Sequence, residues 1–239
     1  MEKHSELQSQ SNVLTATTNE AISATVRATA RLIPNFAWQH LKAATIFRDH
    51  VIQLEERHLV QPFGPFFEEI RSYASGCIMS SAASLEALIN ELFIAHQSRL
   101  RLKLADFEAE FWGRNGIERK PILDKYQLAL DMLQCPLFDE HQTPYRDAWA
   151  LIELRNALVH YKPTWDPERQ RLVDLVEILA NRFQPSPFPD SGSDFVTMKC
   201  MGSGCARWTV DTTLNFMREF DARTSLDPNK MTSFWKLGN

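Results

Sequence analysis

Glycine is scarce in this chain, at 8 of 239 residues, and the few glycines do not form a phosphate-binding loop. Neither the Gly-x-x-x-x-Gly-Lys pattern of P-loop proteins nor the Gly-x-Gly-x-x-Gly pattern of dinucleotide-binding folds occurs. His-Glu-x-x-His and Gly-x-Ser-x-Gly are also absent. The sequence therefore gives no support to a nucleotide-binding, zincin or serine-hydrolase function of these types.

Basic residues are not in excess either. Lys and Arg number 26 against 30 Asp and Glu, for a formal net charge of −4 and a pI near 6.0. Broad, sequence-blind binding of polyanions relies on many Lys and Arg contacts, so this balance counts against it. Local basic clusters at Arg99–Lys103 and Arg114–Lys120 are more typical of solvated surface. Any site for a polyanion is therefore expected to be small and confined to a cleft.

Cysteines are few and scattered, and no secretory signal is evident. The stretch Met1–Asn19 is polar and rich in Ser, Thr and Gln, which predicts a flexible lead. The longest central uncharged run, Ser72–Leu85, has 14 residues, short of the roughly 20 that span a bilayer. Together with four dispersed cysteines, these features predict a cytoplasmic protein without membrane insertion.

Hydrophobic residues recur at helical spacing through most of the chain, which predicts an all-α helical bundle. The predicted organisation is a lead over 1–19, a helical domain over 20–183, and an appendage over 184–239 that packs on the bundle. The expected helices are Ala21–Leu32, Phe36–His58, Glu68–Arg101, Leu104–Trp112, Pro121–Leu133, Tyr145–His160 and Asp166–Phe183.

The appendage begins with a change of composition at Gln184, where three prolines precede Asp-Ser-Gly-Ser. This predicts a linker. Phe195–Lys199 and Ala206–Val210 flank a Gly-Ser-Gly segment and predict a small C-terminal β-hairpin, followed by a closing helix at Asp211–Asp221. Cys200-x4-Cys205 lacks a second pair of ligands, so structural or incidental cysteines are favoured over a metal site.

Arg155-Asn156-Ala-Leu-Val-His160 lies at the end of the expected helix Tyr145–His160. Arg155 projects among apolar positions, so it needs a partner. Asn156 and His160 are four apart and share one stripe with Glu153. Arg155 and His160 are five apart, about 140° around a helix, so they converge only if the last turn loosens or the Arg stem bends.

A partner for Arg155 is expected on the long helix Glu68–Arg101. Within its apolar stretch, Glu86 and Asn90 are four residues apart on one face. Glu86 is the first candidate to hold Arg155, and Glu91 is the second. A buried pair that only fixes the register of two helices is the structural alternative.

The two elements, Ser81–Phe93 and Leu151–Tyr161, resemble the HEPN superfamily of helical domains over about residues 34–183. In that family a long central helix with an embedded polar residue packs against a helix ending in Arg-polar-x3-His. The resemblance implies a bundle that pairs two copies around the motif. In many members it implies a metal-independent endoribonuclease of toxin–antitoxin, antiviral or RNA-processing systems, while other members are not catalytic.

Cleavage of RNA by its own 2′-hydroxyl needs a base, an acid and positive charge on the transition state. A homodimer joined through the Arg155/His160 face would supply two of each side chain, because a twofold interface repeats one patch. His160 is then expected to transfer protons, Arg155 to clamp the phosphate, and Asn156 to orient the imidazole or the 2′-hydroxyl. Glu86 and Asn90 are expected to position these side chains, and Tyr161 and Lys162 are expected to contact RNA at the entrance to the site.

Two other classes stay open. A non-catalytic HEPN-like module would bind a protein partner, RNA or a nucleotide, with Arg155, Asn156 and Glu86 as a polar lock. A metal-dependent hydrolase built on scattered carboxylates would lose its activity to a chelator. The favoured reading requires no metal and no cofactor, and it allows an antitoxin or regulatory protein as a further partner.

Overall fold

The computed structural model describes residues 14–16, 24–26, 35–95, 100, 107–161 and 170–225, and the chain divides into two units after Pro34. In the first unit β1 (Leu14–Ala16) pairs antiparallel with β2 (Ala24–Val26), with Thr15 opposite Thr25. The predicted helix at Ala21–Leu32 is therefore wrong where it overlaps β2. The β-branched residues Thr25 and Val26 suit a strand as well as a helix face.

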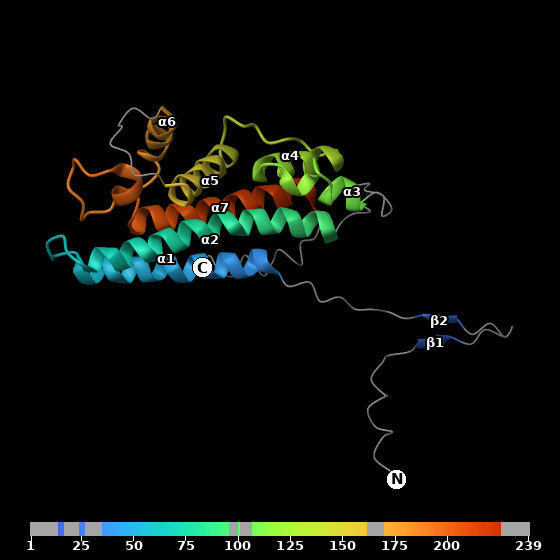
Figure 1. Cartoon of the computed structure of the whole chain (residues 1–239), viewed down its shortest axis with the longest axis horizontal. Coiled ribbons are helices and arrows are strands. Elements are labelled where there is room, and N and C mark those ends of the chain that lie inside the picture. Colours follow the sequence, from blue (N-terminus) through green and yellow to red (C-terminus); the bar gives the residue numbers. More distant parts are fainter. Residues whose placement is uncertain are drawn as a thin grey trace, which may run out of the picture. The chain divides into compact units, whose positions relative to one another are not determined.

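The second unit is helical in its described part, which confirms the predicted all-α class. Two long helices, α1 (Phe36–His58) and α2 (Phe66–Ala95), form a hairpin, and α7 (Ser203–Thr224) packs against both. Figure 1 shows these three side by side as one layer. The shorter elements lie on the other side of α7 and α2: α3 (Phe107–Trp112), η1 (Ile117–Arg119), α4 (Ile122–Met132), α5 (Tyr145–Val159) and α6 (Gln170–Leu179).

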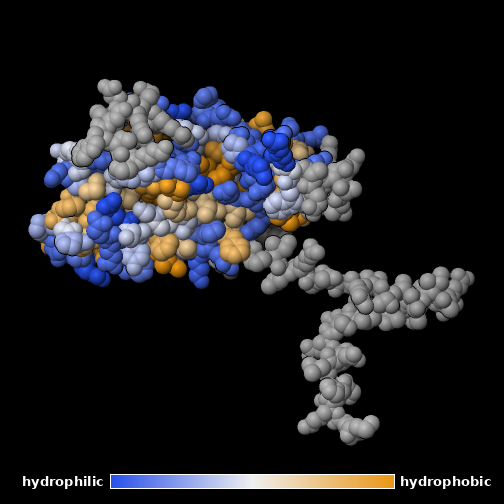
Figure 2. Space-filling model, viewed as in Figure 1, coloured by the Kyte–Doolittle hydropathy of each residue, from blue (hydrophilic) through white to orange (hydrophobic). Residues whose placement is uncertain are grey.

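Helix α2 is the centre of the unit, as its uncharged sequence predicts. Its small residues let neighbours approach closely, and Gly76 lies directly against the Phe47 ring of α1. By length and composition α2 is the one described helix that could cross a membrane, and 50% of that stretch is buried inside the protein. On the face seen in Figure 2, apolar residues form patches interspersed with hydrophilic ones. Packing against α1 and α7 accounts for the apolar character of α2.

The start of α1 is fixed by polar side chains. Asn35 Oδ1 accepts a hydrogen bond from the Trp38 amide at 2.8 Å, and Glu91 Oε1 accepts from the Phe36 and Ala37 amides at 2.7 and 3.1 Å. The first amides of a helix have no acceptor within the helix, so the Glu91 carboxylate supplies one. Its negative charge also interacts favourably with the positive end of the helix dipole. Glu91 is thus committed to α1 and is not a partner of Arg155, which excludes the second of the two candidates.

The predicted C-terminal hairpin is wrong. Phe195–Lys199 forms a π-helical turn, η2, begun by Asp194, and Ala206–Val210 lies inside α7. The glycines that suggested a hairpin turn serve close packing instead: a Cβ on Gly202 would lie 2.5 Å from Glu55 Oε1. The preceding segment, predicted as a linker, packs on the bundle, because the Phe188 ring meets Phe66 and Phe67 edge-on.

Glu55 of α1 caps α7 from another helix. Its buried carboxylate accepts a hydrogen bond from the Ser203 amide at 2.8 Å, whereas the cap residue Gly202 offers no side chain. The missing Cβ of Gly202 is what leaves room for this carboxylate. One close contact therefore positions α7 relative to α1.

Gly202→Ala is expected to lower the free energy of unfolding by about 1–3 kcal/mol, because the new methyl group overpacks the Glu55 and Ser186 site. Gly192→Ala is the matched control, since a Cβ there meets nothing within 4 Å. Urea denaturation of both variants measures the difference. Equal stability of the two variants would contradict this view of the α1–α7 contact.

Candidate functional site

Arg155 and Glu86 meet across the junction of α5 and α2. Arg155 Nη2 lies 3.4 Å from Glu86 Oε2, which confirms the pairing predicted from the sequence. The buried face of α5, with Ala148, Leu151 and Leu154, sets the position of Arg155 against α2. The two side chains are 23% and 43% exposed, so the pair is open to solvent rather than sealed in the core.

Asn90 lies one turn beyond Glu86 but serves a different cation. Its Oδ1 accepts a hydrogen bond from Lys125 Nζ of α4 at 2.9 Å. Lys125 is buried, and desolvation lowers its pKa while the charges of Glu86 and Glu118 act in the opposite direction. Asn90 was expected to support Arg155, and in the structure it anchors α4 to α2 beside the ion pair. The polar residues of α2 thus hold two helices, each through one cation.

His160 is the residue at which α5 ends. Its φ and ψ of −100° and 28° leave the helix, while its amide still donates to Asn156 O at 2.9 Å, so the last turn of α5 keeps its helical hydrogen bond. The imidazole is exposed and has no hydrogen-bond or ion-pair partner among the described residues. Its neighbours Val159 and Tyr161 are also exposed, at 51% and 57%. Lys162 lies outside the described residues.

Asn156 contacts a carboxylate rather than the imidazole. Its Nδ2 donates to Glu153 Oε1 at 3.5 Å, within the stripe that the helical spacing predicts. This bond orients the Asn156 amide on the outer face of α5. The expected contact with His160 is not among the hydrogen bonds of the described residues.

A groove of about 1020 Å³ lies along the outer face of α5, between the start of α4 and helix α6. Arg155 and Asn156 line it, whereas His160 is outside its lining. The groove also contains Trp149, which sequence reasoning missed. Trp149 precedes Asn156 by seven residues and so belongs to the same helical stripe, a signal that was present in the sequence. The charged residues of the lining are Glu86, Arg119, Lys120, Asp124, Glu140, Arg146, Glu153, Arg155, Asp174 and Glu177.

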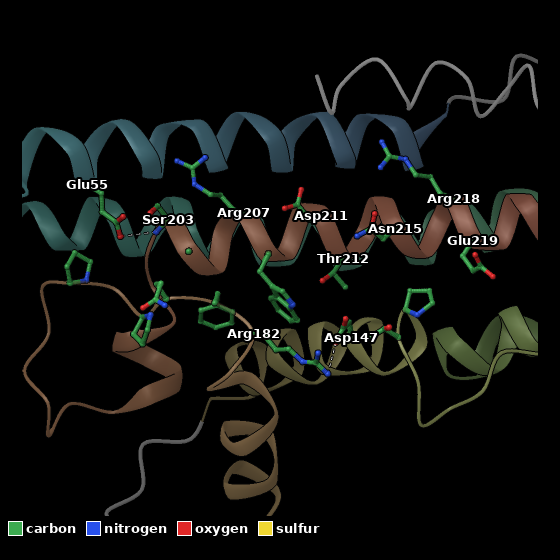
Figure 3. Close-up of a pocket in the computed structure, with 18 of the residues that line it drawn as sticks. Glu55, Asp147, Arg182, Ser203, Arg207, Asp211, Thr212, Asn215, Arg218 and Glu219 are labelled. Atoms are coloured by element: carbon green, nitrogen blue, oxygen red, sulfur yellow. Dashed lines mark hydrogen bonds and ion pairs between the residues drawn. The ribbon is translucent and has the colours of Figure 1, made fainter.

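A second groove, of about 1240 Å³, runs along α7 (Figure 3). Arg207, Asp211 and Asn215 are exposed along its length, while most other positions of α7 are buried. On the facing side Arg182 pairs with Asp147 of α5 at 3.0 Å, and burial raises the pKa of Asp147. No local sequence pattern predicts this groove, because its walls come from segments far apart in the chain.

The cysteines are free thiols in the described structure. Cys77, Cys200 and Cys205 are buried, and burial raises the pKa of Cys77 and Cys200, which keeps these thiols protonated. No group of three or more His, Cys, Asp or Glu side chains suited to a metal ion occurs among the residues that the structure describes. Cys77, Cys200 and Cys205 are therefore core residues, whereas Cys135 is half-buried.

Comparison with known proteins gives no relative: no protein-family model, curated protein or solved structure matches this chain.

The exposure of the Glu86–Arg155 pair predicts a small contribution to stability. In a double-mutant cycle of Glu86→Gln and Arg155→Met, we expect a coupling free energy below about 1 kcal/mol, because solvent screens a pair of this kind. Chemical denaturation of wild type, both single variants and the double variant measures it. A coupling above about 2 kcal/mol would instead identify the pair as a stabilising lock between α2 and α5.

Proposed function

We propose that this protein is a homodimeric, metal-independent endoribonuclease that cuts RNA by attack of the 2′-hydroxyl on the adjacent phosphate. The observation that carries the proposal is the Glu86–Arg155 pair at 3.4 Å in the lining of an open groove, with the exposed His160 five residues after Arg155. A guanidinium in this setting is held by one carboxylate yet keeps donors for a second anion.

The chemistry divides between two side chains. Arg155 clamps the scissile phosphate with its forked donors and stabilises the charge that builds on it. His160 exchanges protons with the 2′-hydroxyl and the leaving 5′-oxygen, since an imidazole ring can both accept and donate a proton. The product of this reaction carries a 2′,3′-cyclic phosphate. Glu86 acts through Arg155 as a positioning residue.

A second copy of the chain completes the site. One motif offers a single imidazole, whereas the reaction uses both a base and an acid. A twofold axis at the end of α5 would bring two His160 side chains together. The exposed Val159 and Tyr161 beside His160 support this, because they supply apolar surface for an interface. Tyr161 and Lys162 then border the RNA entrance.

The cellular setting belongs to the same proposal. The resemblance to HEPN proteins suggests a toxin or antiviral effector in the cytoplasm, held in check by an antitoxin or a regulatory protein. The helical bundle, with α2 covered by α1 and α7, supports a protein that folds in water.

One observation favours a non-catalytic module instead. The groove beside Arg155 contains more carboxylates than cations, and His160 lies outside its lining. In that reading Glu86 and Arg155 align α2 with α5, His160 caps the helix, and the groove binds a protein, RNA or nucleotide partner.

His160→Ala is expected to reduce RNA cleavage by about 10²- to 10⁴-fold, because proton transfer is lost. The measurement is cleavage of a mixed RNA pool by the purified dimer in excess EDTA, with the product ends identified. His50→Ala, on the exposed side of α1, is the matched control and retains activity.

Three results would count against the nuclease. Wild type that cuts no RNA in a diverse pool favours the binding module. Activity that EDTA abolishes points to a metal-dependent hydrolase. If a folded His160→Ala variant cuts RNA like wild type, the imidazole takes no part in the reaction.

A further inference from the structure

Trp149 is one of the residues that line the groove beside Arg155. Its indole is 38% exposed and has no ring contact or hydrogen bond with any described residue. Trp208 and Trp112, in contrast, each contact another aromatic ring: Trp208 packs on Phe183, and Trp112 meets Phe111 edge-on. Exposed indole surface is costly in water and is typical of a binding surface.

The indole lies in line with the motif. Trp149 precedes Asn156 by seven residues and His160 by eleven, so on an ideal helix these two lie about 20° to either side of Trp149. Along the axis Trp149 is about 10 Å from Asn156. A flexible chain in contact with Trp149 can therefore reach the Arg155/His160 end of α5 without leaving this face of the bundle.

The groove lining carries six carboxylates and four cations, so its net charge is negative and a polyanion must bind at the basic side chains. Glu86 is paired with Arg155, and Glu153 accepts from Asn156. Arg119, Lys120 and Arg146 also line the groove, and their side chains form no ion pair with described residues. Arg146 is three residues from Trp149 and so is its neighbour on the helix surface.

We propose that Trp149 stacks a base of single-stranded RNA, with Arg119, Lys120 and Arg146 contacting the flanking phosphates, and so sets which phosphodiester reaches Arg155 and His160. This rests on the proposed function and specifies its substrate class. Every base has a face that can stack on an indole, so the contact tolerates sequence. A duplex keeps its bases stacked on one another and cannot offer such a face.

The test separates binding from cutting by using a 2′-O-methylated oligouridine, which lacks the attacking hydroxyl. Trp149→Ala is expected to weaken its binding by about 5- to 100-fold, as the loss of one stacked base does. Trp149→Phe should retain most of the affinity. Trp112→Ala, which removes a similarly exposed indole outside the groove, should bind like wild type.

The salt dependence gives a second readout of the same complex. With about three phosphate contacts, log K should fall with log salt with a slope near −2 for a single strand. Duplex RNA of the same length should bind more weakly than the single strand. With native RNA, Trp149→Ala should raise KM and leave kcat close to wild type, because the indole is remote from the reacting atoms.

Equal affinity of Trp149→Ala and wild type would overturn the stacking proposal, and cleavage by both would leave the nuclease standing. Binding that depends on Trp149 without any cleavage of native RNA would keep the stacking site and reject the nuclease. If the indole instead contacts another protein chain, Trp149→Ala will change the oligomeric state and leave the RNA affinity unchanged. That result would also reject stacking.

Discussion

The burial of α2 between α1 and α7 is the constraint on which the rest of the structure depends. Because its small and apolar residues are covered on those sides, the few polar residues of α2 are left where other elements can use them. Glu91 accepts hydrogen bonds from the first amides of α1, and Asn90 accepts one from Lys125 of α4. Glu86 forms an ion pair with Arg155 of α5. Each polar residue of this stretch thus fixes one neighbouring element, and Glu86 fixes the one that carries the motif.

For the proposed function, the position of Arg155 matters because the pair remains open to solvent. A sealed pair would act only on stability, whereas a partly exposed guanidinium at a groove can exchange water for a phosphate. His160 is accessible for a related reason: α5 ends there, and the side chain of this cap residue is exposed. The proposed chemistry needs a held cation and a free proton carrier, and the end of α5 offers both.

Sequence reasoning succeeded where helical periodicity decides the outcome. The central helix and the Glu86–Arg155 pair followed from a carboxylate in an apolar stretch facing an arginine on another apolar face. It failed at the C-terminus, where Gly202 suggested a turn but in fact leaves space for the Glu55 carboxylate. That contact joins residues far apart in the chain, and no local pattern encodes it. Trp149 shares the helical stripe of Asn156, but an aromatic residue on a helix face is more often part of a core, so the sequence alone does not single it out.

The most direct test of this account is the molar mass of the purified chain in solution, measured by light scattering during size-exclusion chromatography. A site shared between two copies predicts a mass of twice the 27.5 kDa of one chain at micromolar concentration. A mass of one chain, unchanged as the protein is concentrated, would contradict a shared site at the end of α5.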